Sequence, residues 1–171
     1  MQNQTIAILV FASVLASGCV THHPKTAQEF REAVPGAFLA EVETFVVDRK
    51  FEDVANTFQL KAPECLNMRV KTTSQSNTSY QVIVTDYTPT VHVSADKAEL
   101  HLQQHHEKGV LNITEEPDGG YFLLVADAYS IAGAQTQVDL YRPSVGYKVL
   151  LQAIKNWATG DNIGCPDLTK I

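Results

Sequence analysis

The chain is short of basic residues, glycine and proline, and each shortage excludes a class of protein. Lys and Arg total 13 against 19 Asp and Glu, so the formal net charge is −6. Such a balance provides no extended basic surface, and we therefore expect no nucleic-acid partner. With 9 Gly and 7 Pro in 171 residues, the chain is neither collagen-like nor of low complexity. Hydrophobic residues make up 44%, which is enough for the core of one ordinary domain.

The sequence also lacks an apolar run long enough to span a bilayer, which takes about 20 residues. Residues 6–16 form an apolar run of the length found in the core of a signal peptide. Small residues and a cysteine follow it, in the order Leu15-Ala16-Ser17-Gly18-Cys19. This segment resembles the lipobox of bacterial lipoproteins. The resemblance implies that residues 1–18 are a lipoprotein signal peptide and that Cys19 becomes the first residue, acylated with chains such as palmitate.

The same resemblance implies a location in the cell envelope. An acylated Cys19 would anchor the protein in a membrane, and Val20 in place of Asp implies the outer membrane, with the folded part facing the periplasm. The alternative is ordinary secretory cleavage near Ala16 or Gly18, which would leave Cys19 as a free thiol. We expect residues 19–36 to form a lipidated tether and a short helix, because Thr26-Ala27-Gln28-Glu29 has the spacing of a capping box.

Three cysteines are present, and acylation of Cys19 leaves Cys65 and Cys165 as a pair. In an exported protein we expect this pair to form a disulfide. Two buried free thiols are the alternative. A redox-active pair is disfavoured because the sequence contains no Cys-x-x-Cys motif.

We expect residues 37–171 to form a single α+β domain. After a strand at 42–47, apolar residues at helical spacing predict a helix from Phe51 to Ala62 that Pro63 ends, just before Cys65. From Met68 the apolar period changes to two, which is typical of antiparallel strands with one buried face. The predicted strands cover residues 68–72, 80–85, 91–93, 99–103, 110–114, 120–129 and 135–141. A broad apolar stripe then predicts a helix over 147–158, with Gly160 at its end.

The order of these elements resembles the helix-grip fold of the START and birch-pollen-allergen superfamily. The resemblance covers Val42 to Trp157 and implies an antiparallel meander of about seven strands wrapped on a long C-terminal helix. Meander-rich sandwiches and small barrels are the alternative folds. Folds of the helix-grip class commonly enclose an apolar cavity. The residues that would line such a cavity, or simply fill the core, are Phe58, Tyr80, Phe122, Leu150, Ile154 and Trp157.

Motifs for common enzyme chemistry are missing from the sequence. There is no nucleophile elbow, phosphate-binding glycine loop, dinucleotide fingerprint or zinc-protease helix. The candidate metal ligands are His101 and His105, which share a strand face, with His92 on the neighbouring strand. A solvent-facing polar strand is the simpler interpretation of these histidines, and we expect no metal and no cofactor. We expect Asp86 and Asp127 to lie near turns as solvated or capping residues rather than as a catalytic pair.

These observations favour a lipid-anchored envelope lipoprotein with a structural or interaction role and a protein partner in the envelope. The alternative is a periplasmic binding module for a lipid or another apolar small molecule. An enzymatic role ranks last, since no catalytic spacing is recognised.

Overall fold

The structure is a computed structural model that describes residues 23–75, 80–107, 116–143, 146–161 and 164–168. Its secondary structure is a short helix α1 (Ala27–Ala33), a 3₁₀ turn η1 (Val34–Gly36), strand β1 (Glu41–Val47) and helix α2 (Phe51–Leu66), followed by strands β2 (Met68–Gln75), β3 (Tyr80–Val93), β4 (Lys97–His106), β5 (Tyr121–Ile131) and β6 (Gln135–Arg142), and then helix α3 (Lys148–Thr159). The chain is therefore an α+β protein.

The strands form one antiparallel sheet of 6 strands in the order β1-β6-β5-β4-β3-β2. Strands β2 to β6 are a meander, in which each strand pairs with the next along the chain. Strand β1 joins the far edge by pairing with β6, from Glu41 opposite Arg142 to Val47 opposite Thr136. Only this pairing joins strands that are distant in sequence.

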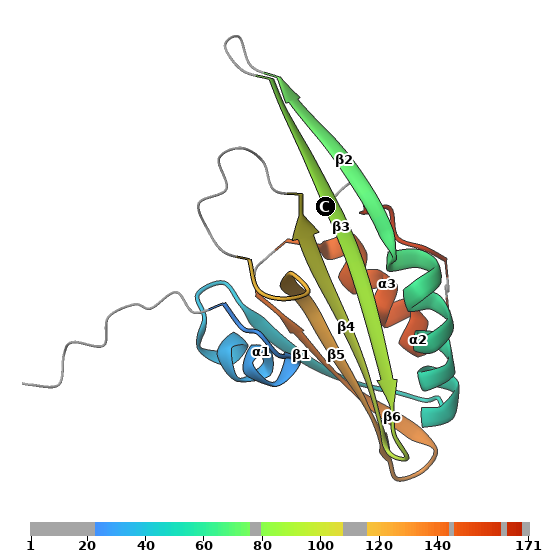
Figure 1. Cartoon of the computed structure of the whole chain (residues 1–171). Coiled ribbons are helices and arrows are strands. Elements are labelled where there is room, and N and C mark those ends of the chain that lie inside the picture. Colours follow the sequence, from blue (N-terminus) through green and yellow to red (C-terminus); the bar gives the residue numbers. More distant parts are fainter. Residues whose placement is uncertain (1–22, 76–79, 108–115, 144–145, 162–163, 169–171) are drawn as a thin grey trace, which may run out of the picture.

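The helices cover both faces of the sheet, as Figure 1 shows. Helices α2 and α3 lie together on one face, where they bury the main core around Phe58, Leu66, Ile154 and Trp157. Helix α1 lies on the other face, where Phe30 and Val34 pack against Val125 in a second, smaller core. Because β5 is in the middle of the sheet, it is covered on both faces, and residues 123–128 are all buried.

Strands β2 and β3 extend past the rest of the sheet (Figure 1). Residues 71–75 pair with residues 80–84, whereas the pairing of β3 with β4 begins only at Thr85 opposite His106. We call the paired residues 71–75 and 80–84 the β2–β3 ribbon. Within the described chain, no third strand pairs with the ribbon and no helix covers its side chains at Tyr80, Val82 and Ile83, which are exposed.

The expected end of α2 at Pro63 is wrong, because the helix continues to Leu66 with Pro63 inside it. A proline inside a helix removes one hydrogen bond and strains the preceding turn. Here the last turn is held by tertiary packing instead, since Cys65 and Leu66 are both buried in the main core. Cys65 therefore belongs to the helix rather than to the segment beyond it.

The described sheet has 6 strands, against the expectation of about seven. The segments predicted at 80–85 and 91–93 are one continuous strand, β3, which passes through Pro89. Pairing with β2 ends at Tyr87, so Pro89 lies where β3 has a strand partner on one side only, and a missing N–H is tolerated there. The strand predicted at residues 110–114 lies outside the described residues.

The start of α1 and the end of α3 follow the predicted signals. The N–H of Glu29 donates to Oγ1 of Thr26 at 3.1 Å at the start of α1. Glu29 in turn accepts from the N–H of Lys25 at 2.8 Å, one residue earlier than in a standard capping box. Gly160 follows α3 with φ +81 and donates to the carbonyl of Asn156, the usual left-handed helix end. None of the helices in the described ranges is both long enough and apolar enough to cross a bilayer.

The disulfide between Cys65 and Cys165 is confirmed, and it joins residues 100 positions apart. It connects the last turn of α2 to the segment that follows α3. Trp157 is attached to the same segment, because its indole Nε1 donates to the carbonyl of Gly164 at 3.0 Å. The two helices of the main core are thus linked covalently at one end.

Removing this disulfide should destabilise the domain strongly. In the chain-entropy account, a closed loop of 100 residues contributes about 4–5 kcal/mol to the free energy of unfolding. We expect a loss of this size for the Cys65→Ala/Cys165→Ala double variant in urea unfolding. Reduction of the wild-type protein is the control and should give a similar loss. A double variant as stable as the oxidised wild type would contradict the assignment.

Candidate functional site

Asp127 is the one charged side chain that the described part of the chain buries completely, with an exposed fraction of 0%. It lies in the middle of β5 and faces α1, not near a turn as expected. Nε of Arg31 donates to its Oδ2 at 2.6 Å, and Nη2 of Arg31 donates to Oδ1 at 2.7 Å. Two parallel, charge-assisted hydrogen bonds fix both distance and orientation. This pair therefore attaches α1 to the sheet.

Two residues of β4 complete the charge balance around this pair. Nη2 of Arg31 lies 2.9 Å from Oε1 of Glu99, and Glu99 also forms an ion pair with Lys97. The ammonium of Lys97 lies 3.5 Å from Oδ2 of Asp127. We call Arg31, Lys97, Glu99 and Asp127 the α1 ionic cluster. It contains two cations and two anions, so its formal charges cancel.

The cluster favours the charged forms of Arg31, Lys97 and Glu99. Burial alone would raise the pKa of Glu99, but the hydrogen bond from Lys97 and the charge of Arg31 outweigh it and lower that pKa. Burial alone would lower the pKa of Arg31, yet its bonds to Asp127 and its attraction to Glu99 raise it. The pKa of Lys97 is raised against burial in the same way, by Glu99 and Asp127. The cluster is therefore an ionic clamp at neutral pH.

His101 borders the cluster without joining it fully. Its side chain is 12% exposed, and its Nε2 lies 3.4 Å from Oε2 of Glu99. This distance is short enough for an ion pair if the ring is protonated. However, Nε2 is buried and makes no hydrogen bond. Burial is the main cause that lowers the pKa of His101, against the attraction of Glu99. The lowered pKa favours the neutral form of His101 at pH 7.

The candidate metal ligands do not converge. The rings of His92 and His101 lie 5.8 Å apart, centroid to centroid. His105 is four residues further along β4, about 13 Å away at strand spacing, where its Nδ1 lies 2.6 Å from Oε2 of Glu116. The His92, His101 and His105 set therefore contains no shared ligand position.

The residues predicted for an apolar cavity are also dispersed. Phe58, Leu150, Ile154 and Trp157 all have an exposed fraction of 0% and belong to the main core between the sheet and helices α2 and α3. Phe122 packs on the opposite face with Phe30, at 5.6 Å between ring centroids. Tyr80 is exposed on the β2–β3 ribbon. Four of the six thus fill the core, and the other two lie elsewhere.

The described surface has a cleft of about 530 Å³ beside the ribbon. It lies where α2 ends and β2, β3 and β4 meet the turn before β5, and none of its described lining residues belongs to α3. Its charged rim is the Arg69–Asp86 pair, with Nε to Oδ1 at 2.6 Å and Nη2 to Oδ2 at 2.7 Å. This cleft differs in position from the cavity that the helix-grip resemblance implies.

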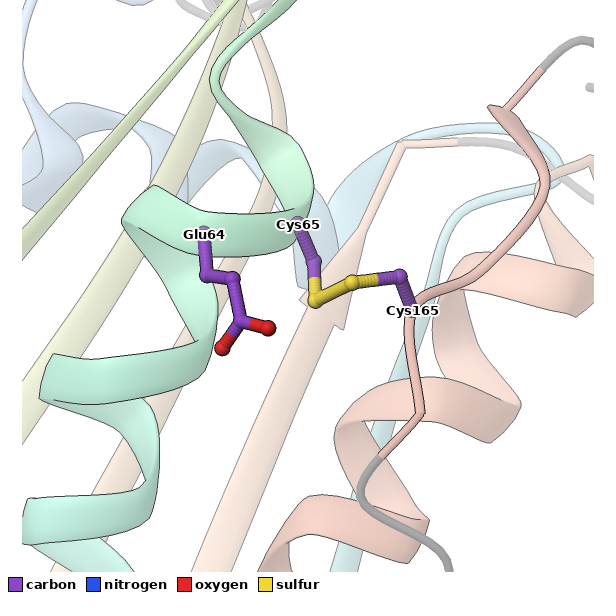
Figure 2. A group of neighbouring side chains, drawn as sticks. All are labelled: Glu64, Cys65 and Cys165. Atoms are coloured by element: carbon purple, nitrogen blue, oxygen red, sulfur yellow. A yellow bond between two sulfur atoms is a disulfide. The ribbon is translucent and has the colours of Figure 1, made fainter.

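Glu64 lies beside the disulfide, as Figure 2 shows. Its carboxylate and the two sulfur atoms of Cys65 and Cys165 fall within 4.8 Å of one another, the one such grouping of possible metal ligands among the described residues. Both sulfur atoms are used in the bond between them. A disulfide sulfur is a poor metal ligand because it carries no thiolate charge. The carboxylate is paired with Lys61 at 2.8 Å.

The chain matches no protein-family model, and no curated protein is significantly similar to it. The site must therefore be interpreted from its own geometry. Its most distinctive part, the α1 ionic cluster, was not predicted from the sequence. The signal that could have pointed to it is an aspartate inside the most apolar strand, since a buried carboxylate requires a cation.

Replacing Arg31 by Met should destabilise the protein, because it leaves Asp127 buried without its main partner. Breaking a buried pair in this way costs about 3–5 kcal/mol. The measurement is urea unfolding of wild type and variant at pH 7. Arg69→Met is the matched control, since the Arg69–Asp86 pair has the same two-bond geometry on the surface, and it should cost only a small part of that amount. Equal losses for both variants would contradict a special role for the buried pair.

Stability should fall as the pH is lowered from about 7.5 to 5, because the unfolded chain takes up a proton at His101 before the folded protein does. The pKa of the buried ring is below its ordinary value, so the loss begins near the unfolded pKa of about 6.5 and stops below the folded pKa. We expect His101→Gln to flatten this part of the profile, measured as urea midpoints. Glu99 affects stability at lower pH, because the stability that its ionised form contributes is lost as the pH falls through its lowered pKa. Equal slopes above pH 5 for variant and wild type would contradict the prediction.

Proposed function

We propose that the chain is a lipid-anchored lipoprotein of the cell envelope whose folded domain binds a protein partner there. The lipobox-like segment ending at Cys19 supports the anchor and an outer-membrane location. The disulfide of Cys65 with Cys165 suits an oxidising compartment such as the periplasm. The role proposed for the domain is structural rather than catalytic.

The observation that carries the proposal is the exposed β2–β3 ribbon. Tyr80 is 68% exposed, and Val82 and Ile83 are each 39% exposed although they point to opposite faces of the ribbon. Strands without neighbours present free N–H and C=O groups, to which a strand of another protein can add. The ribbon has apolar side chains on both faces, and no third strand of the described residues pairs with it, so it is suited to protein binding.

The interior supports a structural role as well. Helices pack on both faces of the sheet outside the ribbon, Trp157 is fully buried in the main core, and the charges of the α1 ionic cluster pair with one another. We include the helix-grip fold in this proposal, because a strand and a helix precede the meander and a helix follows it. The apolar-ligand alternative has weaker support, since four of its predicted cavity residues are core residues.

Photo-crosslinking in intact cells tests the partner. A photoreactive amino acid at Tyr80 should capture one or a few defined envelope proteins, because the ribbon would lie in the interface. The matched control is Leu60 on α2, which is exposed to a similar degree, at 64%, and should capture none of them. Capture must disappear when Val82 and Ile83 are changed to Ser.

Two outcomes would contradict the proposal. Identical capture patterns from positions 80 and 60, or no capture at all, would remove the ribbon as a docking element. Intact-mass analysis of the native protein tests the anchor separately. A retained leader, or an unmodified Cys19, would remove the lipid attachment even if the partner were found.

A further inference from the structure

The segment from Ala33 to Ala40 carries no charged or polar side chain and is largely exposed. Its sequence is Ala-Val-Pro-Gly-Ala-Phe-Leu-Ala. At its centre Phe38 is 90% exposed and Leu39 is 51% exposed. Scattered apolar residues are normal on a protein surface, but eight in succession with an exposed phenylalanine at the tip are not. We call residues 37–39 the apolar tip.

The two ends of the segment are fixed, and the tip projects between them. Val34 is buried in the small core under α1, and Ala40 packs at the edge of the same core. The N–H of Ala37 donates to the carbonyl of Val34, and the N–H of Ala40 donates to the carbonyl of Ala37, each at 3.2 Å. Two successive turns therefore hold the tip in place.

The backbone of the tip is strained at Leu39. Leu39 has φ +64, in the left-handed region that a leucine rarely occupies. Glycine or asparagine would meet this geometry with less strain. Packing inside the domain does not explain why leucine occupies this position, because half of its side chain is exposed. Such a combination points to a contact outside the chain.

His23 and the segment that carries the tip both lie near the beginning of β5. The ring of His23, at the start of the described chain, contacts the ring of Tyr121 at 4.8 Å. Ala40 packs against the small core that contains Val125, so His23 and Ala40 both lie near the stretch of β5 from Tyr121 to Val125, which is about 13 Å long. Only six residues separate Cys19 from Thr26, so the seven Cα–Cα steps between them limit the tether to about 25 Å.

We propose that the apolar tip inserts into the lipid bilayer beside the acyl anchor and so fixes the orientation of the domain on the membrane. This inference rests on the lipid anchor of the proposed function. The short tether brings this side of the domain to the membrane surface, where uncharged apolar side chains are stabilised among lipid chains. A second contact of this kind restrains a domain that a tether alone would leave free to rotate.

Fluorescence quenching by brominated lipids tests the insertion. The acylated full-length protein carries Ala37→Cys labelled with a fluorophore, in vesicles of phosphatidylethanolamine with a minor fraction of phosphatidylglycerol. Lipids brominated near the top of the acyl chain should quench this label at least about twofold, because only inserted groups meet them. The matched control, the same label on Leu60→Cys in α2, should not be quenched.

The double variant Phe38→Ser/Leu39→Asn separates insertion from folding. Asparagine accepts the left-handed backbone, so the urea midpoint should be unchanged or higher, whereas quenching at position 37 should be lost.

Four results would overturn the inference. The first is equal, weak quenching at positions 37 and 60 with acylated protein. The second is a label at 37 that aqueous iodide cannot reach in intact envelopes but reaches in vesicles, which would mean that a protein covers the tip. The third is a label at 37 that iodide cannot reach in a dimer of the protein without lipid, which would mean that a second copy of the chain covers the tip. The fourth is an unacylated Cys19 by intact mass, which identifies failure of the anchor itself.

Discussion

The ion pair of Arg31 with Asp127 determines where the N-terminal part of the chain lies. The carboxylate is buried in a central strand, so it can be charged only if a cation reaches it, and α1 supplies that cation. Once α1 is held, Phe30 and Val34 close the small core beside it, and the direction of the chain before and after the helix is set. The tether and the apolar tip owe their common position to this contact.

The two faces of the sheet are stabilised by different means. The face under α2 and α3 depends on apolar packing and the disulfide, whereas the face under α1 depends on charges surrounded by a few aromatic rings. Buried ion pairs contribute less net stability than apolar packing. They offset the cost of burying the charges only when the two side chains are well aligned. The α1 face therefore requires one specific geometry. It is also sensitive to acid, because the folded state lowers the pKa of both His101 and Glu99 and protonation of either group destabilises it.

Local signals predicted most of the fold, and tertiary interactions caused the failures. Capping at Thr26, the glycine at 160 and the change of period at Met68 all mark observed boundaries. Pro63 does not end its helix, because burial of Cys65 holds the following turn. The disulfide was predicted from the number of cysteines, because acylation of one of the three leaves a single pair. The α1 ionic cluster did not follow from any local pattern, because Arg31 and Asp127 are 96 positions apart and β5 shows only one unexplained carboxylate.

Among the contacts that join the first part of the chain to the last, three span a similar length. Arg31 to Asp127 spans 96 positions, the disulfide 100, and the ion pair of Glu41 with Arg142 spans 101. A chain that emerges N-terminus first therefore exposes its first helix and strand before their partners exist. The meander from β2 to β6 can form from neighbouring segments as they appear. Strand β1 must wait for nearly the whole domain, with its hydrogen-bonding edge open, and during that interval it is the segment that most needs protection by a chaperone.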